Sequence, residues 1–188
     1  MEQDKTQKKK KQKKEESSSP YKWALQVFLL AIVLSAALSL TSESLLNGAN
    51  IAIALLILSI FIGVGIVFDV IGVAVTAADA KPFHSMAAHH EKGAKEALML
   101  LRNASHVSSV CNDVVGDICG IVSGTTAAVI VVRLQHVLNT QSILISVLFT
   151  SLVSGLTIGG KALGKTFAIS QSTKVVYWAG RFLHVLHT

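Results

Sequence analysis

Charged residues are scarce in this sequence of 188 residues. Only 15% are Asp, Glu, Lys or Arg, while 51% are hydrophobic, and an average soluble domain carries roughly a quarter charged residues. Only two prolines are present, which is typical of a chain built mainly of helices. The composition therefore excludes an ordinary water-soluble globular domain and predicts an integral membrane protein.

Cysteine is equally scarce. The two cysteines, Cys111 and Cys119, lie in an apolar stretch and form neither a Cys-x-x-Cys motif nor a zinc-ligand spacing. This pattern excludes a disulfide scaffold and a zinc module. We expect both thiols to be buried as small hydrophobic side chains.

The few charges are concentrated at the N-terminus. Residues 1–20 contain seven of the 17 Lys and Arg residues and no hydrophobic residue beyond Met1. Such a segment cannot bury enough apolar surface to fold, so it is predicted to be a disordered basic tail. We expect this tail to contact anionic lipid. Because the net charge of +6 arises mostly from the tail and from lysines near the membrane, no nucleic-acid partner is predicted.

Four apolar stretches are long enough to cross a hydrocarbon layer of ~30 Å, which takes about 20 residues. The first, residues 21–41, is interpreted as an N-terminal transmembrane anchor, with a cleaved signal peptide as the alternative. The other three are residues 50–76, 107–133 and 142–160, within a transmembrane domain of residues 50–168. The expected fold is an all-α integral membrane protein with four transmembrane helices.

Two further segments have the pattern of helices that lie on a membrane surface. Residues 84–103 carry mixed charges at helical spacing and an apolar side, which predicts an interfacial helix. Residues 169–188 are predicted to form an amphipathic C-terminal helix.

The basic residues also predict an orientation. With four spans, both termini and the 77–106 loop lie on one side of the membrane, together with nearly all Lys and Arg residues. Cytoplasmic loops carry an excess of these residues. We therefore expect a multi-pass protein of the cell membrane with both termini in the cytoplasm.

Only three charged residues lie well inside the predicted spans: Asp69, Asp113 and Asp117. A charge at the bilayer centre costs at least ~2.5 kcal/mol on insertion scales, so such residues are functional candidates by default. Counted at ~1.5 Å per residue from the ends of their spans, the three side chains reach similar depths. Because clustered carboxylates need protons or a cation to offset their repulsion, they are predicted to bind magnesium or another divalent cation. No other cofactor is expected.

The alternative is structural, with partly protonated aspartates that form hydrogen bonds between helices. Small residues beside the aspartates favour close helix packing in either case. The predicted helix-packing glycines are Gly65, Gly72, Gly116, Gly120, Gly124, Gly155 and Gly159.

Two other kinds of site are disfavoured. Asp113 and Asp117 match half of the aspartate motif of the CDP-alcohol phosphotransferases, but no Asp-Gly-x-x-Ala-Arg segment precedes them, and no enzyme is predicted. His84, His89 and His90 lie within residues 84–103, where a solvated helix face is expected instead of a metal site.

Several short motifs resemble the transmembrane domain of the cyclin-M and CorB-type magnesium transporters. Ala-Val-Thr-Ala at residues 74–77 resembles the end of the family's first span, and Leu-Leu-Arg-Asn at 100–103 resembles a motif of its juxtamembrane helix. Val-Gly-Asp at 115–117 falls where the family has Ile-Gly-Asn, and residues 160–168 resemble the segment after its last span. The resemblance covers roughly residues 50–187.

This resemblance implies a three-span core with a juxtamembrane helix, a homodimer and a magnesium site. Three positions differ from the family's functional residues: Gly72 stands for an acidic residue, Asp117 for Asn, and Lys161 for Glu. Residues 23–40 add a span that the family's domain lacks.

Two hypotheses about function follow. The first is a small cation transporter or channel subunit whose ion site is lined by Asp69, Asp113 and Asp117. The second is a non-transporting membrane scaffold or assembly partner that keeps the fold without the ion site. The three acids inside the spans favour the first hypothesis, and Lys161 in place of a glutamate favours the second.

Overall fold

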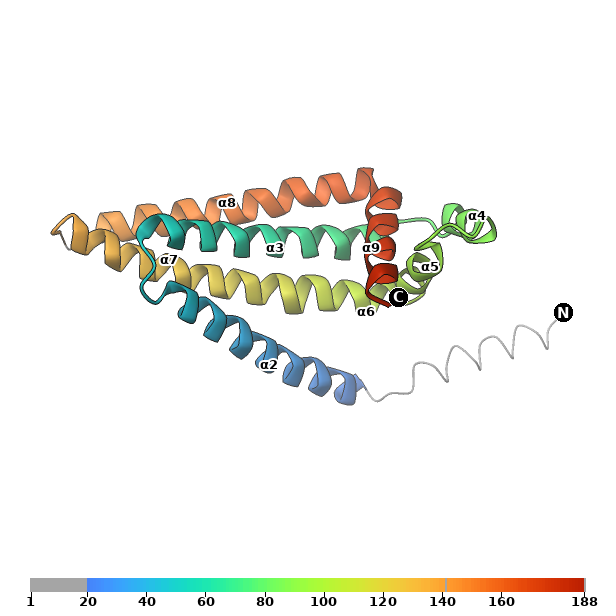
Figure 1. Ribbon diagram of the computed structural model, residues 1–188, viewed down its shortest axis with the longest axis horizontal. Helices are drawn as coiled ribbons and strands as arrows, with labels where there is room; N and C mark the ends of the chain where they lie inside the picture. Colours follow the sequence, from blue (N-terminus) through green and yellow to red (C-terminus); the bar gives the residue numbers. More distant parts are fainter. Residues whose placement is uncertain (1–19, 141, 188) are drawn as a thin grey trace.

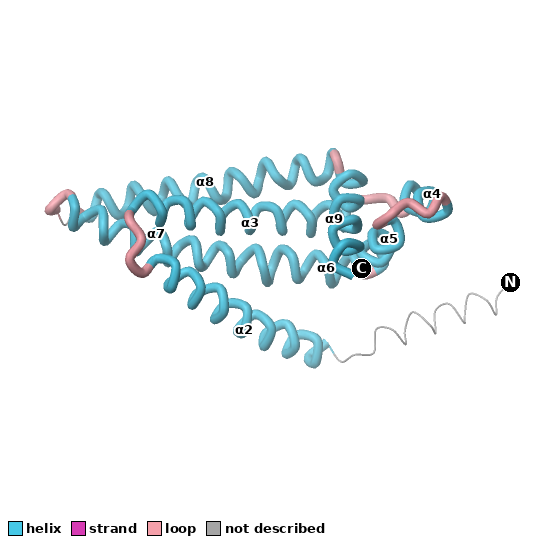
Figure 2. The backbone as a smooth tube through the Cα atoms, in the orientation of Figure 1, coloured by secondary structure: helices cyan, strands magenta, loops and turns pink. Residues whose placement is uncertain are grey.

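The computed structural model describes residues 20–140 and 142–187, and within these ranges the chain forms only helices and short connections (Figure 1, Figure 2). The predicted all-α fold is confirmed for this part of the chain. The basic tail was predicted over residues 1–20, of which 1–19 lie outside the described residues. In chain order the elements are α2 (Pro20–Leu46), α3 (Ile51–Ala77), α4 (Lys81–Ala88), α5 (Ala94–Arg102), α6 (Ala104–Ser109), the π-helix η1 (Val110–Gly116), α7 (Asp117–Val137), α8 (Ile143–Ser170) and α9 (Ser172–His187).

Four helical segments of the described chain are long and apolar enough to cross a membrane: Tyr21–Leu46, Ile51–Ala77, Ala104–Val137 and Ile143–Ser170. They agree with the predicted spans in order and approximate position. The fourth was predicted to end at residue 160 but continues to Ser170. Beyond residue 160, Gly160 and Gly164 lie directly against α3 and keep the two helices in contact.

The four long segments lie side by side, with α3 at the centre (Figure 1). Helix α3 contacts α7, η1 and α8 along its length, while α2 contacts mainly α7 and slants away from the other helices toward its N-terminal end. The connections from α2 to α3 and from α7 to α8 lie at one end of the bundle, which we call the hairpin end. Helices α4, α5 and α9 lie at the other end, which we call the amphipathic end.

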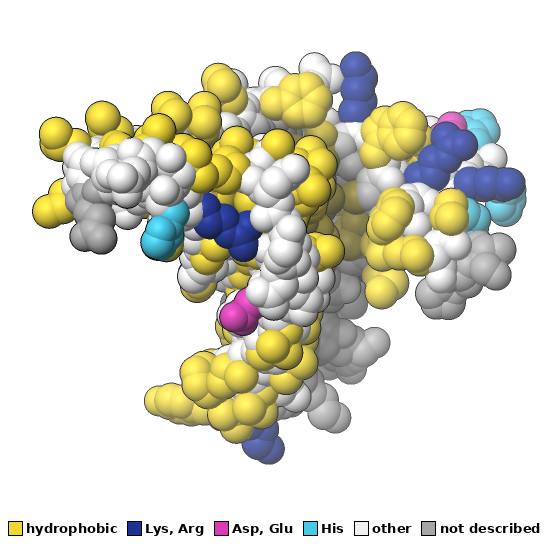
Figure 3. Space-filling view, turned by 60° about the vertical axis from the view of Figure 1, so that its left-hand side comes forward, with side chains coloured by type: hydrophobic (Ala, Val, Ile, Leu, Met, Phe, Trp, Pro, Cys, Tyr) yellow, Lys and Arg dark blue, Asp and Glu magenta, His cyan; other side chains and the backbone are white. Residues whose placement is uncertain are grey.

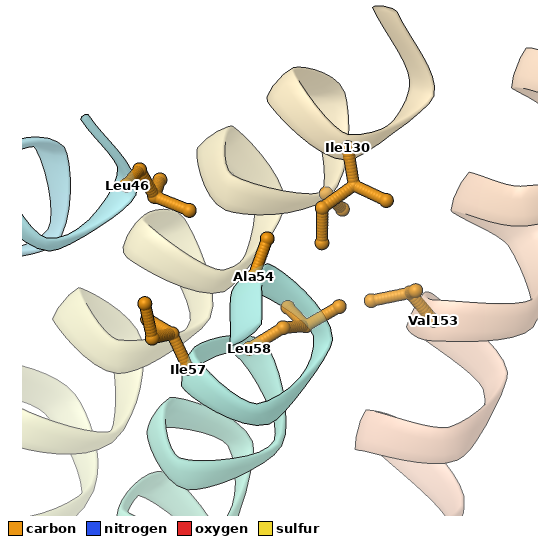
Figure 4. Packing of buried hydrophobic residues seen from close by; sticks show 7 residues of the cluster. Leu46, Ala54, Ile57, Leu58, Ile130 and Val153 are labelled. Atoms are coloured by element: carbon orange, nitrogen blue, oxygen red, sulfur yellow. The ribbon is translucent and has the colours of Figure 1, made fainter. Parts of the chain in front are cut away.

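The core of the hairpin end is apolar (Figure 4). Leu46, Ala54, Leu58, Ile130 and Val153 are all buried in one cluster that joins α2, α3, α7 and α8. Packing of this kind is a main source of helix association in a membrane, because lipid tails offer no hydrophobic driving force between helices. In Figure 3, which brings the hairpin end forward, hydrophobic side chains cover much of the sides of the bundle, while polar side chains and backbone, with His and Lys or Arg side chains, are visible at the near tip.

Two polar side chains of α7 form hydrogen bonds to residues at the hairpin end. The Arg133 guanidinium donates hydrogen bonds to the carbonyl oxygens of Leu46 and Ala49. The Gln135 amide donates to the Ser142 carbonyl at 3.1 Å and to the Ser146 hydroxyl at 3.0 Å. These contacts connect α7 to the segments on both sides of it at the hairpin end.

The amphipathic end differs from its prediction. The single interfacial helix expected over residues 84–103 is instead two short helices, α4 and α5, separated by a turn in which His90 and Gly93 have positive φ angles of 57° and 89°. Helix α9 crosses this end of the bundle (Figure 1) and its backbone presses on the turn. A Cβ atom at Gly93 would lie 2.7 Å from the Arg181 Cα, so both the backbone conformation and the space require glycine there.

Candidate functional site

A buried ion pair lies between α3 and α8. The Asp69 carboxylate is only 5% exposed, and its Oδ2 lies 3.4 Å from the Nζ of Lys161, whose side chain is 22% exposed. The same ammonium donates a hydrogen bond of 3.4 Å to the carbonyl oxygen of Gly116, the last residue of η1. Three helical segments therefore meet at one set of polar atoms, which together with Asn112 we call the polar centre.

Two glycines of α8 allow Lys161 to reach α3. A Cβ atom at Gly160 would lie 2.5 Å from the Ile66 Cδ1, and one at Gly164 would lie 2.8 Å from the Val70 Cγ2. The backbone of α8 therefore approaches the side chains of α3 closely on both sides of Lys161. Small residues permit such approach between membrane helices, and here they place an ammonium group against Asp69.

Gly116 likewise allows the backbone of η1 to approach α3 closely. A Cβ atom at this position would lie 2.6 Å from the Asp69 Oδ1, which is closer than atoms in contact allow. The absence of a side chain thus lets the Asp69 carboxylate lie against the backbone of the π-helix. Short π-helical turns inside α-helices frequently occur at functional sites.

Asn112 supplies a fourth polar group, and one of its atoms has no partner. Its amide nitrogen donates to the Ser108 hydroxyl at 3.2 Å. Its Oδ1 is buried and accepts no hydrogen bond from the described residues. It lies so close to Gly72 that a Cβ atom there would be 2.2 Å away. A buried acceptor without a partner costs roughly 1–3 kcal/mol, so this oxygen is a place where a water molecule or a cation would be stabilised.

The other two predicted ligands do not join Asp69. Asp113 and Asp117 are both exposed on the surface of the chain. Among residues 20–140 and 142–187, no three His, Cys, Asp or Glu side chains are grouped as a metal ion would require. The three aspartates therefore do not form one site within this chain, and their role as ligands stays a prediction. The physical reason is that η1 turns Asn112 and Gly116, and not the aspartates, toward α3.

The predicted helix-packing glycines divide into two groups. Gly65, Gly72 and Gly116 lie at contacts between α3 and the η1–α7 segment, where a Cβ atom would be within 3.1 Å of a neighbour. The remaining four have open space on the side that a Cβ atom would take, with no described atom within 4 Å: Gly120, Gly124, Gly155 and Gly159. Contacts within the chain therefore do not explain these four glycines.

Sequence reasoning noted Lys161 only as a departure from the family's glutamate and named neither Lys161 nor Asn112 as a site residue. Lys161 was placed one residue beyond the expected end of the last span, although the pair Gly160 and Gly164 signalled that helix packing continues there. Asn112 is uncharged and gave no signal of its own. The prediction of buried free cysteines is confirmed for Cys111 and Cys119.

The ion pair is the dominant electrostatic feature of the polar centre. Removing one partner of a buried pair typically costs about 3–5 kcal/mol, because the other charge is left without compensation. Asp69 and Lys161 therefore each stabilise the buried charge of the other. The centre can thus hold one positive charge stably, and the Lys161 ammonium provides it.

Comparisons with protein families, with curated protein sequences and with solved structures find no match to this chain. The resemblance to the cyclin-M and CorB-type transporters therefore stays a prediction.

Proposed function

We propose that this chain is a multi-pass membrane protein that acts as a non-transporting scaffold or assembly partner. In this proposal both ends of the chain face the cytoplasm, in line with the distribution of Lys and Arg residues. The observation that carries the proposal is the contact of the Lys161 ammonium with the Asp69 carboxylate and the Gly116 carbonyl.

Lys161 supports this proposal because its ammonium occupies the oxygen atoms that a metal ion would use. Carboxylate and backbone carbonyl oxygens are the preferred ligands of magnesium and calcium. A divalent ion at these oxygens would lie beside a positive charge, and the repulsion disfavours binding. The Lys161 ammonium thus stabilises these oxygen atoms as a bound cation would, but it is covalently attached and cannot be released.

The role as an assembly partner is supported by the open glycines. Gly120 and Gly124 on α7, and Gly155 and Gly159 on α8, have no described atom where a Cβ would lie. Glycines spaced by four residues let two membrane helices approach closely. The faces of α7 and α8 are therefore suited to further membrane helices, and the homodimer implied by the family resemblance is one such assembly.

A second candidate function, divalent cation transport, is favoured by Asn112. Its Oδ1 is buried, has no partner among the described residues and lies against Gly72, three residues after Asp69 on α3. If the Lys161 side chain left the centre, Asp69, Asn112 and the Gly116 carbonyl would offer three oxygen ligands of the kind that magnesium prefers.

Flux measurements on the purified full-length protein in liposomes separate the two candidates. With Mg²⁺, Mn²⁺, Co²⁺ and Ca²⁺ tested in turn, we expect no flux above that of protein-free liposomes. Metal-dependent flux that disappears in Asp69→Asn would overturn the scaffold proposal and establish transport.

A charge reversal sharpens this test. We expect the Lys161→Glu variant to gain a rise in melting temperature with added divalent ions, because binding to the folded state alone stabilises it. The control is Lys165→Glu, since Lys165 is exposed one turn further along α8 and should give no such response. Equal responses of both variants would show that the metal binds outside the polar centre.

A further inference from the structure

We propose that a groove between α5 and α9 at the amphipathic end binds an anionic phospholipid, with its headgroup at Lys95 and an acyl chain beside Val107. The groove encloses about 400 Å³, which is within the range of roughly 300–1,000 Å³ typical of small-molecule sites. Its walls include Lys95, Met99, Asn103 and Val107 on one side and Leu183 and Leu186 of α9 on the other.

The groove changes from polar to apolar along its length. Lys95 and Met99 lie on α5 and Val107 lies on α6, with Asn103 at the break between the two helices, and all four line the groove. Lys95 carries a positive charge and Val107 is purely apolar. A ligand that matches these two residues has an anionic group at one end and a hydrocarbon chain at the other.

The apolar end of the groove meets the membrane boundary. Val107 belongs to α6, at the start of the candidate span Ala104–Val137. Next to it, the His106 ring lies 5.3 Å from the Trp23 ring, between centroids, and tryptophan is enriched where membrane and water meet. The polar end lies on α5, beyond the ends of the long helices (Figure 1). The groove therefore spans the level at which phospholipid headgroups and the first methylene groups are found.

Two contacts hold α9 at a fixed distance from α5 and keep the groove open. Gly180 lies against the turn before α5, where a Cβ atom would be 2.5 Å from the Gly93 carbonyl oxygen. Further along, the His184 Nδ1 lies 2.8 Å from the Glu96 Oε1. Glu96 also lines the groove, but its carboxylate is engaged by His184. Lys95, which is exposed at the mouth, is thus the charged group available to a ligand.

An anionic phospholipid fits these features better than a neutral one. The groove is lined by one lysine and one glutamate, and the Glu96 carboxylate contacts His184, so Lys95 is the charge that meets a headgroup. Each Lys near the surface contributes about fivefold in affinity at roughly 1 kcal/mol. The inference relies on the membrane location proposed above but not on the contact between Lys161 and Asp69. Flux measurements test the scaffold proposal and lipid measurements test the groove, so either proposal can be overturned without the other.

Native mass spectrometry of the full-length protein released from a neutral detergent tests the proposal. Phosphatidylglycerol and phosphatidylcholine with identical acyl chains are offered at equal concentration, and glycerol phosphate is offered separately as the headgroup alone. We expect one phosphatidylglycerol to be retained in preference to phosphatidylcholine, and no retention of glycerol phosphate. Equal retention of the two lipids would overturn the proposal. A dimer that retains no lipid would also overturn it, because a second copy of the chain would then be the occupant of the groove.

Matched variants locate the site. We expect Lys95→Gln to lower the preference for phosphatidylglycerol about fivefold, while Lys92→Gln, an exposed lysine outside the groove, leaves it unchanged. Leu183→Trp fills the groove and should remove the retained lipid. Leu148→Trp, at an exposed position on α8, controls for the added bulk. If Lys95→Gln and Lys92→Gln behave alike, or if Leu183→Trp keeps the lipid while folded, the groove is not the binding site.

Discussion

At the hairpin end the helices meet through apolar side chains, whereas at the level of Asp69 they meet around a buried ion pair. The apolar cluster spreads its contacts over several residues of α2, α3, α7 and α8. The polar centre concentrates its contacts on Asp69, Lys161 and the Gly116 carbonyl. The same four-span bundle is thus stabilised in two different ways along its length.

The two regions should differ in how much stability a substitution costs. A smaller side chain in an apolar cluster leaves a cavity, and its cost grows with the volume that is lost. A neutral side chain in a buried ion pair leaves a charge without compensation, and its cost is large regardless of volume. Substitutions at the polar centre should therefore have the largest effects.

The largest effect is expected for Lys161→Met, which keeps the length of the side chain and removes its charge. Asp69 is then buried without a positive partner, and the free energy of unfolding should fall by about 3–5 kcal/mol. Thermal unfolding of the detergent-solubilised protein, followed by circular dichroism, measures the loss.

Two further variants test this explanation. Lys165→Met removes an exposed lysine of the same helix and should leave stability within experimental error. Adding Asp69→Asn to Lys161→Met should restore most of the loss, because no uncompensated charge remains. If the double variant is no more stable than Lys161→Met, the ion pair is not the source of the effect.

A smaller effect is expected for Gly116→Ala. The added Cβ would lie 2.6 Å from the Asp69 Oδ1, so the carboxylate or the π-helix must shift, at a cost of typically 1–3 kcal/mol. Gly120→Ala is the matched control, because no described atom lies within 4 Å of its Cβ position. The comparison of melting temperatures should show a loss for Gly116→Ala only.

The control also tests the proposed assembly surface. Gly120→Ala should leave the stability of the single chain unchanged but weaken association where α7 packs on another helix, as size-exclusion chromatography with light scattering would detect. A loss of stability in the single chain would contradict the open space seen around Gly120.

The sequence predicted the four long apolar helices well, because a stretch of about 20 apolar residues, the length that can cross a membrane, can be read directly from the sequence. It also singled out Asp69, since a charge inside a span is rarely without a role. Neither argument depends on how the helices are rotated about their axes. Both predictions therefore hold without knowledge of how the helices pack.

The composition of the polar centre could not be predicted in the same way. The expected ion site assumed regular α-helical geometry through both aspartates, but Asp113 lies inside the π-helix η1, and both Asp113 and Asp117 are exposed. Lys161 was not placed in the site because the span was predicted to end one residue before it. At the amphipathic end, the left-handed conformation of His90 and Gly93 divides a segment whose charge pattern predicts one continuous helix.

The smallest effect is expected at the hairpin half of the bundle, for a buried pair of hydroxyl groups on Ser42 of α2 and Thr126 of α7. Their oxygen atoms are 3.1 Å apart. Hydrogen bonds between membrane helices contribute about 0.6 kcal/mol on average, and Thr126 keeps a second bond of 2.8 Å to the Val122 carbonyl when Ser42 is removed. Ser42→Ala should therefore lower stability by only about 0.6 kcal/mol. A double-mutant cycle with Thr126→Val measures the coupling of the two hydroxyls directly. A coupling as large as that between Asp69 and Lys161 would show that polar contacts dominate both ends of the bundle, and the contrast between the two regions would be lost.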